Sequence, residues 1–577
     1  MPPRSSDHDR PQTKFMFVGG PSFNAHRSGN LRSTLLRRVL SERRVKRRQD
    51  AADKLDHILK GQGDPPAFCS CAQESESSAE ASGYRPIKPR NEQSLDPARG
   101  SDTGRDGCST CGGLLPPSAP ASRGQASRVP SPQPLGTGSY DPLLPVDPVA
   151  SGLKVQELLH FAVTVIWPHF RPLSYAGDCY HSWVFPVENN VQLYAILWAS
   201  SYHRDVLRVT YGREPQLDSK EQLQLKGLAL KSLQAELANI SGSSPLDGVV
   251  MCVLYLAVNE RYMTKVFRDP SPFCPPFQNL HALDFYGSRD YHPLHWNVVQ
   301  DIIQRFGGIE VLQAFALAWL VSISGLMNAI HTLQKPVYPI LGVDGKRLDL
   351  PPPLLLFHLD RGRFPHDTPG LGFYELLHIW PPVRQQIVSV FIHIGEFSQV
   401  IQFYSEKTCS PAVLDLMGDT RNLVHHRLFS LPDENDRLEL ILDCGGGSSG
   451  ETELSREIYL ACRLGVILYA IHVTYPVPRS QGLRDSILQR LHPKIDRLMN
   501  EQVPGRLLLW CVTIAVIAMG DGASNSPNQL TMYMRRLCHN LSVNSLPKLM
   551  GLLHTFVWVD GVVPDHCEGL WRRISSL

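Results

Sequence analysis

The sequence predicts an all-α protein in which a large multi-helix domain follows a basic helix and a long disordered linker. From about residue 151 onward, apolar residues recur at spacings of three and four, interrupted by Pro and Gly, which is typical of many packed helices. Residues 61–150 hold 14 Pro, 11 Gly and 13 Ser, a composition that favours low complexity over a packed core. Arginines are concentrated in residues 27–48. We therefore divide the chain into a disordered N-terminus (1–26), a basic segment (27–60), a disordered linker (61–150) and a helical domain (151–577).

The basic segment is predicted to form a helix that begins after Asn30, whose side chain can cap it. Leu31, Leu35 and Val39 would share one face of this helix, and arginines occupy the other faces. Residues 27–48 contain nine Lys and Arg against one Glu, which is a local charge of +8 in a chain whose net charge is +2. The rest of the chain therefore carries a charge of about −6, so the positive charge is local.

A basic leucine zipper is excluded because the sustained heptads of a coiled coil do not follow the arginines. Three interpretations of the basic segment remain open: a nuclear-import signal, direct contact with nucleic acid, or a solvated charged helix without a specific role. Import and nucleic-acid contact are compatible, and both place the chain in a nucleus. The side chains expected to contact an import receptor or DNA are Arg32, Arg37, Arg38, Arg43, Arg44, Lys46, Arg47 and Arg48.

The opening residues and the distribution of cysteines along the chain favour an intracellular protein. The polar opening residues lack the apolar core of a secretory signal peptide. The thirteen cysteines are scattered, odd in number and mostly placed in apolar segments, which indicates reduced thiols. The linker is too poor in apolar residues to offset the entropy of ordering, so it would separate the basic segment from the helical domain.

Within the helical domain, one boundary illustrates the local signals. Four apolar residues line one face of a helix that Gly242 is placed to end; they are Leu230, Leu233, Leu237 and Ile240. Ser244 can then cap the next helix, with Pro245 at its first position and the Asp247 carboxylate in its first turn. The segment Val249–Val258 that follows is apolar all round, as a central helix would be.

Further buried helices are predicted by their apolar residues, and the region Thr408–Gly450 between them is expected to be less regular. Its Gly445–Gly450 run indicates a surface loop. No repeat of 20 to 50 residues recurs, so a solenoid is not predicted, although stacked helix pairs stay open as an arrangement. The remaining predicted helices are Val191–Ser201, Val299–Arg305, Val311–His331, Arg384–Tyr404, Arg456–His472, Leu507–Ala518 and Leu546–Trp558.

Membrane insertion is not expected. The segment Val311–Gln334 contains no Asp, Glu, Lys or Arg and is long enough to span a bilayer, but it also contains polar residues such as Gln313, Asn328 and Gln334, which suit a buried helix better. Leu507–Gly520 is more apolar and too short to span.

We found no pattern that predicts an enzyme, a metal site or a cofactor. Two cysteine pairs, Cys69 with Cys71 and Cys108 with Cys111, could supply four zinc ligands, but they lie far apart in the linker without a basic run between them. The segment Gly446–Gly450 matches the G-x-S-x-G nucleophile elbow, and Leu438–Leu442 before it could be taken for the strand that an elbow requires, yet no alternation of strands and helices surrounds it.

Histidines offer no metal-binding spacing either. None of them forms the i, i+4 pair with a glutamate that a helical metalloprotease uses. They are expected to be surface or hydrogen-bonded core residues; the five considered are His358, His366, His378, His425 and His426.

Several short motifs resemble those of the fungal-specific transcription-factor family, in particular members that lack the N-terminal binuclear zinc cluster. Phe15–Val18 is similar to the family's F-x-F-V segment, and Arg32–Arg38 is similar to the basic R-S-H-V-M-R stretch, with Thr34 in place of the histidine. In the helical domain, His295-Trp296 and then Arg305–Ile309 with Leu312 resemble a helix that ends in R-G-G-L/I-x-x-L.

The C-terminal half adds three similarities in the order that the family has them. Trp319 resembles the tryptophan of the next helix, although Val321 stands where an acidic residue is frequent. Leu507–Trp510 resembles the L-L-x-W helix. Phe556–Asp560 and Gly569–Trp571 resemble the closing F-L-W-x-D and G-x-x-L-W segments. On physical grounds these tryptophans and glycines are core and turn residues, not ligands.

The resemblance implies a nuclear transcription regulator, with a helical regulatory domain that takes input from effectors or from other transcription proteins. It also allows the control of a metabolic gene set. A helical interaction or scaffold protein that does not bind DNA is the alternative from another class, and an enzyme in a helical fold is a third.

Overall fold

The computed structural model describes residues 154–171, 174–184, 190–213, 219–238, 246–259, 266–359, 370–443, 448–520, 529–563 and 571. These residues form eighteen α-helices with short 3-10 and π turns and no strand, so the all-α prediction is confirmed for the described part of the helical domain. Two isolated bridges, Leu341 with Arg347 and Val383 with Leu442, are the β pairings in this part. The N-terminus, the basic segment and the linker lie outside the described residues.

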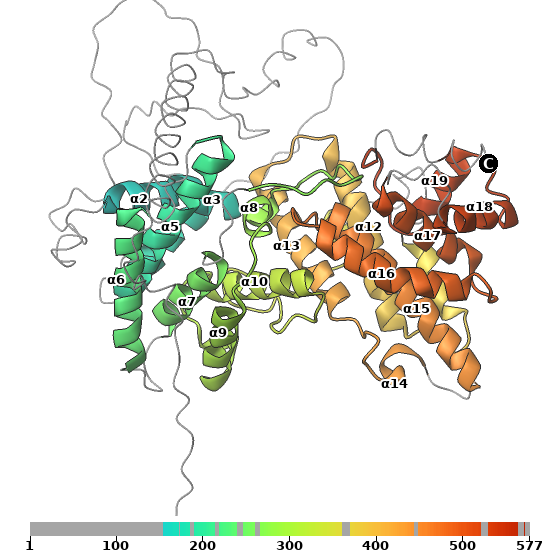
Figure 1. Cartoon of the computed structure of the whole chain (residues 1–577), viewed down its shortest axis with the longest axis horizontal. Helices are drawn as coiled ribbons and strands as arrows, with labels where there is room; N and C mark the ends of the chain where they lie inside the picture. The colour runs from blue at the N-terminus through green and yellow to red at the C-terminus, as the bar shows by residue number, and fades with distance from the viewer. Residues whose placement is uncertain are drawn as a thin grey trace, which may run out of the picture. The chain divides into compact units, whose positions relative to one another are not determined.

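A first group of helices packs around α5 and α7 (Figure 1). Long α5 contacts α6 and α7, and α7 contacts α9. The group consists of α2 (Val155–Phe161), η4 (Ala162–Ile166), α3 (Trp167–Phe170), α4 (Ser174–Trp183), α5 (Asn190–Thr210), α6 (Lys220–Ala238), α7 (Asp247–Asn259), η5 (Leu280–Ala282), α8 (Leu283–Tyr286), α9 (Pro293–Arg305), η6 (Ile309–Val311) and α10 (Leu317–Thr332).

A second group packs around α15 and α17. There α15 contacts α16 and α17, and α17 contacts α18. The elements are α11 (Pro353–Leu356), η8 (Leu371–Leu377), α12 (Gln385–Ser405), α13 (Pro411–Phe429), α14 (Leu438–Ile441), α15 (Ser449–Tyr469), η9 (Ala470–Thr474), α16 (Gln481–Leu498), α17 (Gly505–Met519), α18 (Gln529–Asn540) and α19 (Leu546–His554).

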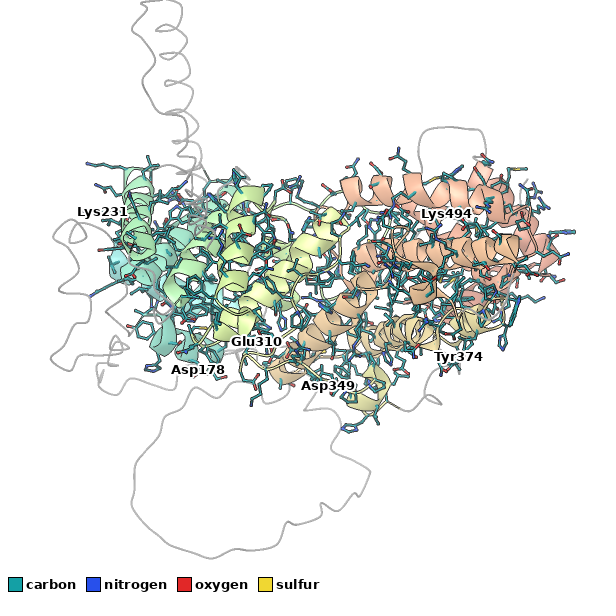
Figure 2. The ribbon with its side chains drawn as sticks, turned by 90° about the horizontal axis from the view of Figure 1, so that it is seen from below. Asp178, Lys231, Glu310, Asp349, Tyr374 and Lys494 are labelled. Atoms are coloured by element: carbon teal, nitrogen blue, oxygen red, sulfur yellow. The ribbon has the colours of Figure 1, made fainter. Side chains whose placement is uncertain are left out.

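Helix α13 joins the two groups because it contacts α10 and η5 of the first group and α12 of the second. Figure 1 shows α10 and α13 between the green helices around α7 and the orange helices around α15. Nearly all buried hydrophobic side chains of both groups belong to one continuous core. Figure 2 shows exposed polar side chains at the periphery, among them Lys231 of α6 and Glu310 of η6.

Most predicted helices form, with corrected ends. The helix expected at Val311–His331 begins only at Leu317, because a 3-10 turn and Ala316 at φ 57° precede it. The helix expected at Leu546–Trp558 stops at His554. The helix expected at Arg456–His472 begins earlier, at Ser449, and ends in the π turn η9.

Thr408–Gly450 is more regular than predicted. It contains the 19-residue helix α13, which starts where the Ser410 hydroxyl accepts a hydrogen bond from the backbone N–H of Val413. The expected loop at Gly445–Gly450 is wrong at its end, because Ser448 caps α15 through a capping box with Glu451. Residues 444–447 are outside the described part.

The boundary before α7 is described only in part, because Ile240, Gly242, Ser244 and Pro245 lie outside the described residues. Asp247 does stand in the first turn of α7, as predicted. Its Oδ1 atom also accepts hydrogen bonds from the backbone N–H groups of Gln313 (2.8 Å) and Ala314 (2.9 Å), which fixes the turn before α10.

The motif residues that resemble the fungal family lie in the core and at a turn. Gly307 and Gly308 follow α9 at φ 110° and 105°, values that favour glycine at a helix stop. Trp319 is fully buried. The Trp510 indole N–H donates to the Val557 carbonyl at 3.2 Å, so two of the C-terminal motifs pack against each other.

Backbones approach closely where α12 crosses the segment before η8. A Cβ added at Gly395 would lie 2.7 Å from the Gly370 Cα atom and 2.9 Å from the Phe556 carbonyl oxygen. These neighbours are backbone atoms that cannot rotate away, so glycine is required at this crossing.

Two described helices are long and apolar enough to cross a membrane by length and composition alone: α12, and α15 together with η9. In the most apolar window of α12, 67% of the residues are buried inside the protein, and in that of Ser449–Thr474 all are. Such burial is what core helices of a large helical domain show. Helix α10, in the segment with no charged residue, has only 16 residues.

Candidate functional site

The predicted site residues of the basic segment, Arg32 to Arg48, lie outside the described residues, as do Cys69, Cys71, Cys108 and Cys111. Their roles stay predictions. Among the described residues, no group of three or more His, Cys, Asp or Glu side chains is placed to hold a metal ion. The seven described cysteines are unpaired thiols, and five of them are buried.

The serines of the G-x-S-x-G match and the histidines named from the sequence have structural roles or lie at the surface, where they belong to the described residues. Ser448 and Ser449 begin helix α15, and the segment before them forms α14 rather than a strand. His426 is hydrogen-bonded to the Tyr338 carbonyl at 2.9 Å, whereas His358 and His378 are exposed. His366 is outside the described part.

The structure reveals instead a small cavity inside the first group of helices, which we call the aromatic cavity. Its volume is about 40 Å³. Its walls come from η4, α3, α4, α7, α8, α10 and the turn after α8. The lining residues are Ile166, Trp167, Phe170, Trp183, Leu254, Tyr255, Val258, Tyr286, Tyr291, Leu320, Ile323, Ser324 and Met327.

A local irregularity of the chain shapes one wall of the aromatic cavity. Residues 162–166 form a π turn in which the Trp167 N–H donates to the Ala162 carbonyl, five residues back. Pro168 follows at once and has no N–H to offer the carbonyl four residues before it, so a regular α-helix could not continue here without a lost hydrogen bond. The widened turn sets the direction in which Trp167 and Phe170 enter the core.

Polar groups on the cavity wall are few and uncharged. Tyr291 is hydrogen-bonded to the Ser324 hydroxyl, and the Tyr286 hydroxyl lies 3.3 Å from His203 Nδ1. Burial raises the pKa of Tyr255 and of Tyr286 well above the ordinary value of 10.0, so both remain neutral phenols.

A buried polar cluster lies next to the aromatic cavity, at the junction of the two helix groups. Arg171, which follows α3, donates from Nη1 to Asp415 Oδ2 at 2.7 Å and from Nη2 to Asp419 Oδ1. Both carboxylates stand on α13, one helical turn apart. The arginine therefore ties the end of α3 to α13. We define the polar cluster as Arg171, His281, Asp415, Asp419, Arg421, Asn422 and His425.

His281 continues the cluster toward η5. Its Nε2 lies 3.3 Å from Asp415 Oδ1, and its Nδ1 lies 3.2 Å from Asn422 Nδ2. The ring fits against α13 only because Gly418 stands beside it: a Cβ at Gly418 would lie 2.5 Å from His281 Nε2. Arg421 adds a hydrogen bond to the Leu280 carbonyl at 3.0 Å.

His425 ties α13 to the π turn η9 of the second group. Its Nδ1–H donates to the Arg421 carbonyl at 2.6 Å, and its Nε2 accepts from the Thr474 hydroxyl at 2.8 Å. Tyr475 packs at 5.2 Å between ring centroids, and the Arg421 guanidinium lies 4.6 Å from the centroid of the Tyr475 ring. The polar cluster therefore contacts both helix groups.

Burial dominates the ionisation of the polar cluster. It lowers the pKa of His281 to about 4 although Asp415 favours the charged ring, and Arg171 and Arg421 lower it further. Burial and the nearby Arg421 guanidinium lower the pKa of His425 to about 3, against a hydrogen bond to the Arg421 carbonyl that raises it. Burial raises the pKa of Asp419 to about 6, more than Arg171 lowers it.

The aromatic cavity and the polar cluster are connected at two places, where consecutive residues of the chain belong to one and contact the other. Phe170 lines the cavity, and the next residue, Arg171, forms the ion pairs. On α10, Trp319 lies under the Arg171 guanidinium at 4.7 Å, and the next residue, Leu320, lines the cavity. A shift of the residues that line the cavity would therefore also move Arg171 relative to Asp415 and Asp419 of α13.

Neither feature could be read from spacing alone. The polar residues of α13 occupy its buried face, which hides the apolar period of a core helix. The cavity residues come from segments about 160 residues apart in the sequence, and the one local signal was Pro168 within an aromatic run.

No protein-family model, no curated protein and no solved structure matches this chain. The resemblance to the fungal-specific transcription-factor family therefore rests on the motifs quoted above and stays a prediction.

Proposed function

We propose that the chain is a nuclear transcription regulator. The basic segment carries the import signal and contacts DNA, and the helical domain receives regulatory input from effectors or other transcription proteins. The observation that carries the proposal is the charge distribution: +8 within residues 27–48 of a chain whose net charge is +2. A positive run of this density attracts nucleic-acid phosphates and import receptors alike.

The order of the sequence motifs and their physical roles support the same proposal. The glycines after α9 and the three tryptophans that resemble family positions, Trp319, Trp510 and Trp558, serve a helix stop and the buried core. A large helical domain with an internal cavity and a buried polar junction also suits a regulatory role, because both features can bias how helices pack.

Nuclear import is tested by replacing the cluster Arg43, Arg44, Lys46, Arg47 and Arg48 with alanine in a fluorescent fusion of the full chain. The fusion is expected to lose nuclear accumulation, whereas a matched variant with five exposed surface residues of α6 changed to alanine keeps it. Unchanged accumulation of the cluster variant would remove the import role.

DNA contact needs a separate measurement, since import alone would suit a protein that does not bind DNA. The full chain is titrated with duplex DNA over a salt series, and the logarithm of the binding constant is expected to fall linearly with the logarithm of salt concentration. With the cluster changed to alanine the slope should fall by about 4 to 5, because each neutralised phosphate contributes about 0.9. An absence of binding at low salt favours the scaffold alternative.

A further inference from the structure

We propose that an open cleft beside the C-terminal end of helix α12 binds a small aliphatic diamine in its doubly protonated form. The cleft has a volume of about 350 Å³. Its walls are residues 274–276 before η5, residues 560–562 after α19, and Gln402, Ser405 and Glu406 at the end of α12. We call it the acidic cleft. The inference goes beyond the proposed function, because it depends neither on DNA contact nor on nuclear import.

Hydrogen bonds hold the three walls of the acidic cleft together. The Cys274 backbone N–H donates to the Val562 carbonyl at 2.7 Å. The Asp560 backbone N–H donates to the side-chain oxygen of Gln402, and the Ser405 hydroxyl donates to the Gln402 carbonyl at 2.8 Å. The cleft is therefore formed before a ligand arrives, so little of the binding free energy is used to order its walls.

The size of the acidic cleft suits an organic ligand. Ligand sites in proteins have volumes of about 300–1,000 Å³, and about 350 Å³ lies at the lower end of this range. A single inorganic ion would leave most of this space to water. Pro275, Pro276 and Val562 provide an apolar wall, against which a short hydrocarbon chain can pack as the stem of a lysine does.

The charge of the walls selects a cation. Glu406 and Asp560 are the charged residues among those that line the cleft, and no Lys, Arg or His is among them. Glu406 directly follows Ser405, the last residue of α12, where the helix dipole is negative. Lys407 lies over the Phe403 ring, 3.1 Å from its centroid, and does not line the cleft.

The second carboxylate is held in position by a buried histidine. Asp560 Oδ1 lies 3.0 Å from His554 Nε2, and the histidine side chain is only 6% exposed. The Asp560 side chain is 53% exposed, so a ligand can reach it. Two accessible carboxylates in one cleft favour a ligand with two ammonium groups joined by a short chain, because each group can then form an ion pair.

The first measurement is isothermal titration calorimetry of the full chain with 1,4-diaminobutane at low ionic strength. Saturable binding is expected, and the affinity should fall as salt is added, because exposed ion pairs are screened. The neutral 1,4-butanediol has the same hydrocarbon chain and should not bind, and neither should the dianion succinate. Absence of saturable binding by the diamine, or equal binding by the diol, would overturn the proposal.

Cys274 reports where the diamine binds. It is an exposed thiol that lines the cleft, whereas Cys409 is partly exposed and lies outside the cleft lining. Alkylation by N-ethylmaleimide, followed by peptide mass spectrometry, should become slower at Cys274 in saturating diamine and stay unchanged at Cys409. Equal alkylation rates at Cys274 with and without the diamine would place the binding elsewhere and overturn the assignment.

Charge-neutral variants test the two carboxylates. Glu406→Gln should weaken diamine binding about threefold, because a single exposed ion pair is weak, and the double variant Glu406→Gln with Asp560→Asn should weaken it about tenfold. The matched control Glu439→Gln changes an exposed glutamate of α14 outside the cleft lining and should keep the wild-type affinity. Wild-type affinity in the double variant would contradict the assigned carboxylates.

An ammonium group could also come from a lysine side chain of a partner protein. Nα-acetyl-lysine methylamide represents this source and carries one ammonium group, so it should bind more weakly than 1,4-diaminobutane. Tighter binding of the lysine derivative would overturn the diamine assignment. These measurements use neither DNA nor a nucleus, so their failure leaves the import and DNA-binding tests standing, and failure of those tests leaves the acidic cleft standing.

Discussion

Replacement of His425 by glutamine is expected to make the stability of the protein less dependent on pH. His425 is completely buried, and its folded-state pKa of about 3 lies below the ordinary value of 6.5. Because the folded state keeps the ring neutral, the unfolded state binds a proton first as the pH falls. The contribution of His425 is therefore fully present above pH 6.5 and is lost as the pH falls toward 3.

The magnitude follows from the distance of the assay pH from the ordinary pKa. One pKa unit corresponds to about 1.4 kcal/mol, so lowering the pH to about 5 removes about 2 kcal/mol through His425 alone. The pKa values of His281 and His472 are also lowered, to about 4 and about 3. These two histidines together therefore lower the free energy of unfolding by about 4 kcal/mol more at the same pH. Burial raises the pKa of Asp419 to about 6, so this group becomes protonated in the folded state as the pH falls. Its protonation therefore raises the free energy of unfolding by about 1 kcal/mol over the same pH range.

The assay is urea unfolding of the full chain at about pH 7.5 and about pH 5. We expect His425→Gln to lose about 2 kcal/mol less between these conditions than the wild-type chain does, because the contribution of His425 is absent from the variant. The glutamine can still donate to the Arg421 carbonyl and accept from Thr474, so the variant should fold. His358→Gln, at an exposed position, is the control and should behave as wild type. An equal pH dependence of His425→Gln and wild type would refute the reasoning.

Three further changes test the packing of the helical domain. Arg171→Met should cost about 3 kcal/mol in urea unfolding because it leaves the half-buried Asp419 carboxylate without its arginine and removes one of the two partners of Asp415. Adding Asp419→Asn should restore part of that loss, and a full cost in the double variant would argue against the ion pair. Gly395→Ala should lower the free energy of unfolding by about 3 kcal/mol, because the added Cβ meets backbone atoms. Gly227→Ala on α6, where the Cβ has open space, should raise it by up to about 1 kcal/mol. Equal effects of the two variants on the melting temperature would contradict the close approach at Gly395. Trp510→Phe removes one buried indole hydrogen bond and some ring area, for which a loss of about 2 kcal/mol is expected; a change below about 0.5 kcal/mol would show that this contact contributes little.

The sequence predicted helices best where apolar residues alone set the pattern. Val249–Val258 became most of α7, and Leu507–Ala518 became most of α17, because both segments are buried on all sides and need no polar partner. The ends were less predictable. Ala316 adopts a positive φ, which neither its residue type nor the neighbouring sequence predicts. Helix α10 begins directly after it instead of at Val311.

The polar cluster shows why α13 was missed. Its residues Arg421, Asn422 and His425 are buried, but their partners come from η5 and η9, which are distant in the sequence. A polar residue is recognised as a core residue only when its partner is known. For the same reason the aromatic cavity could not be predicted, since its walls come from five helices and their turns.

The most direct test of the proposed function is a chromatin occupancy map of the full chain, compared with the variant in which Arg43, Arg44, Lys46, Arg47 and Arg48 are alanine. To separate DNA contact from import, both chains carry an added, independent nuclear-import signal. We expect discrete enriched sites for the wild-type chain and their loss in the variant. Wild-type chromatin signal no higher than that of an untagged control, with the protein in the nucleus, would contradict it.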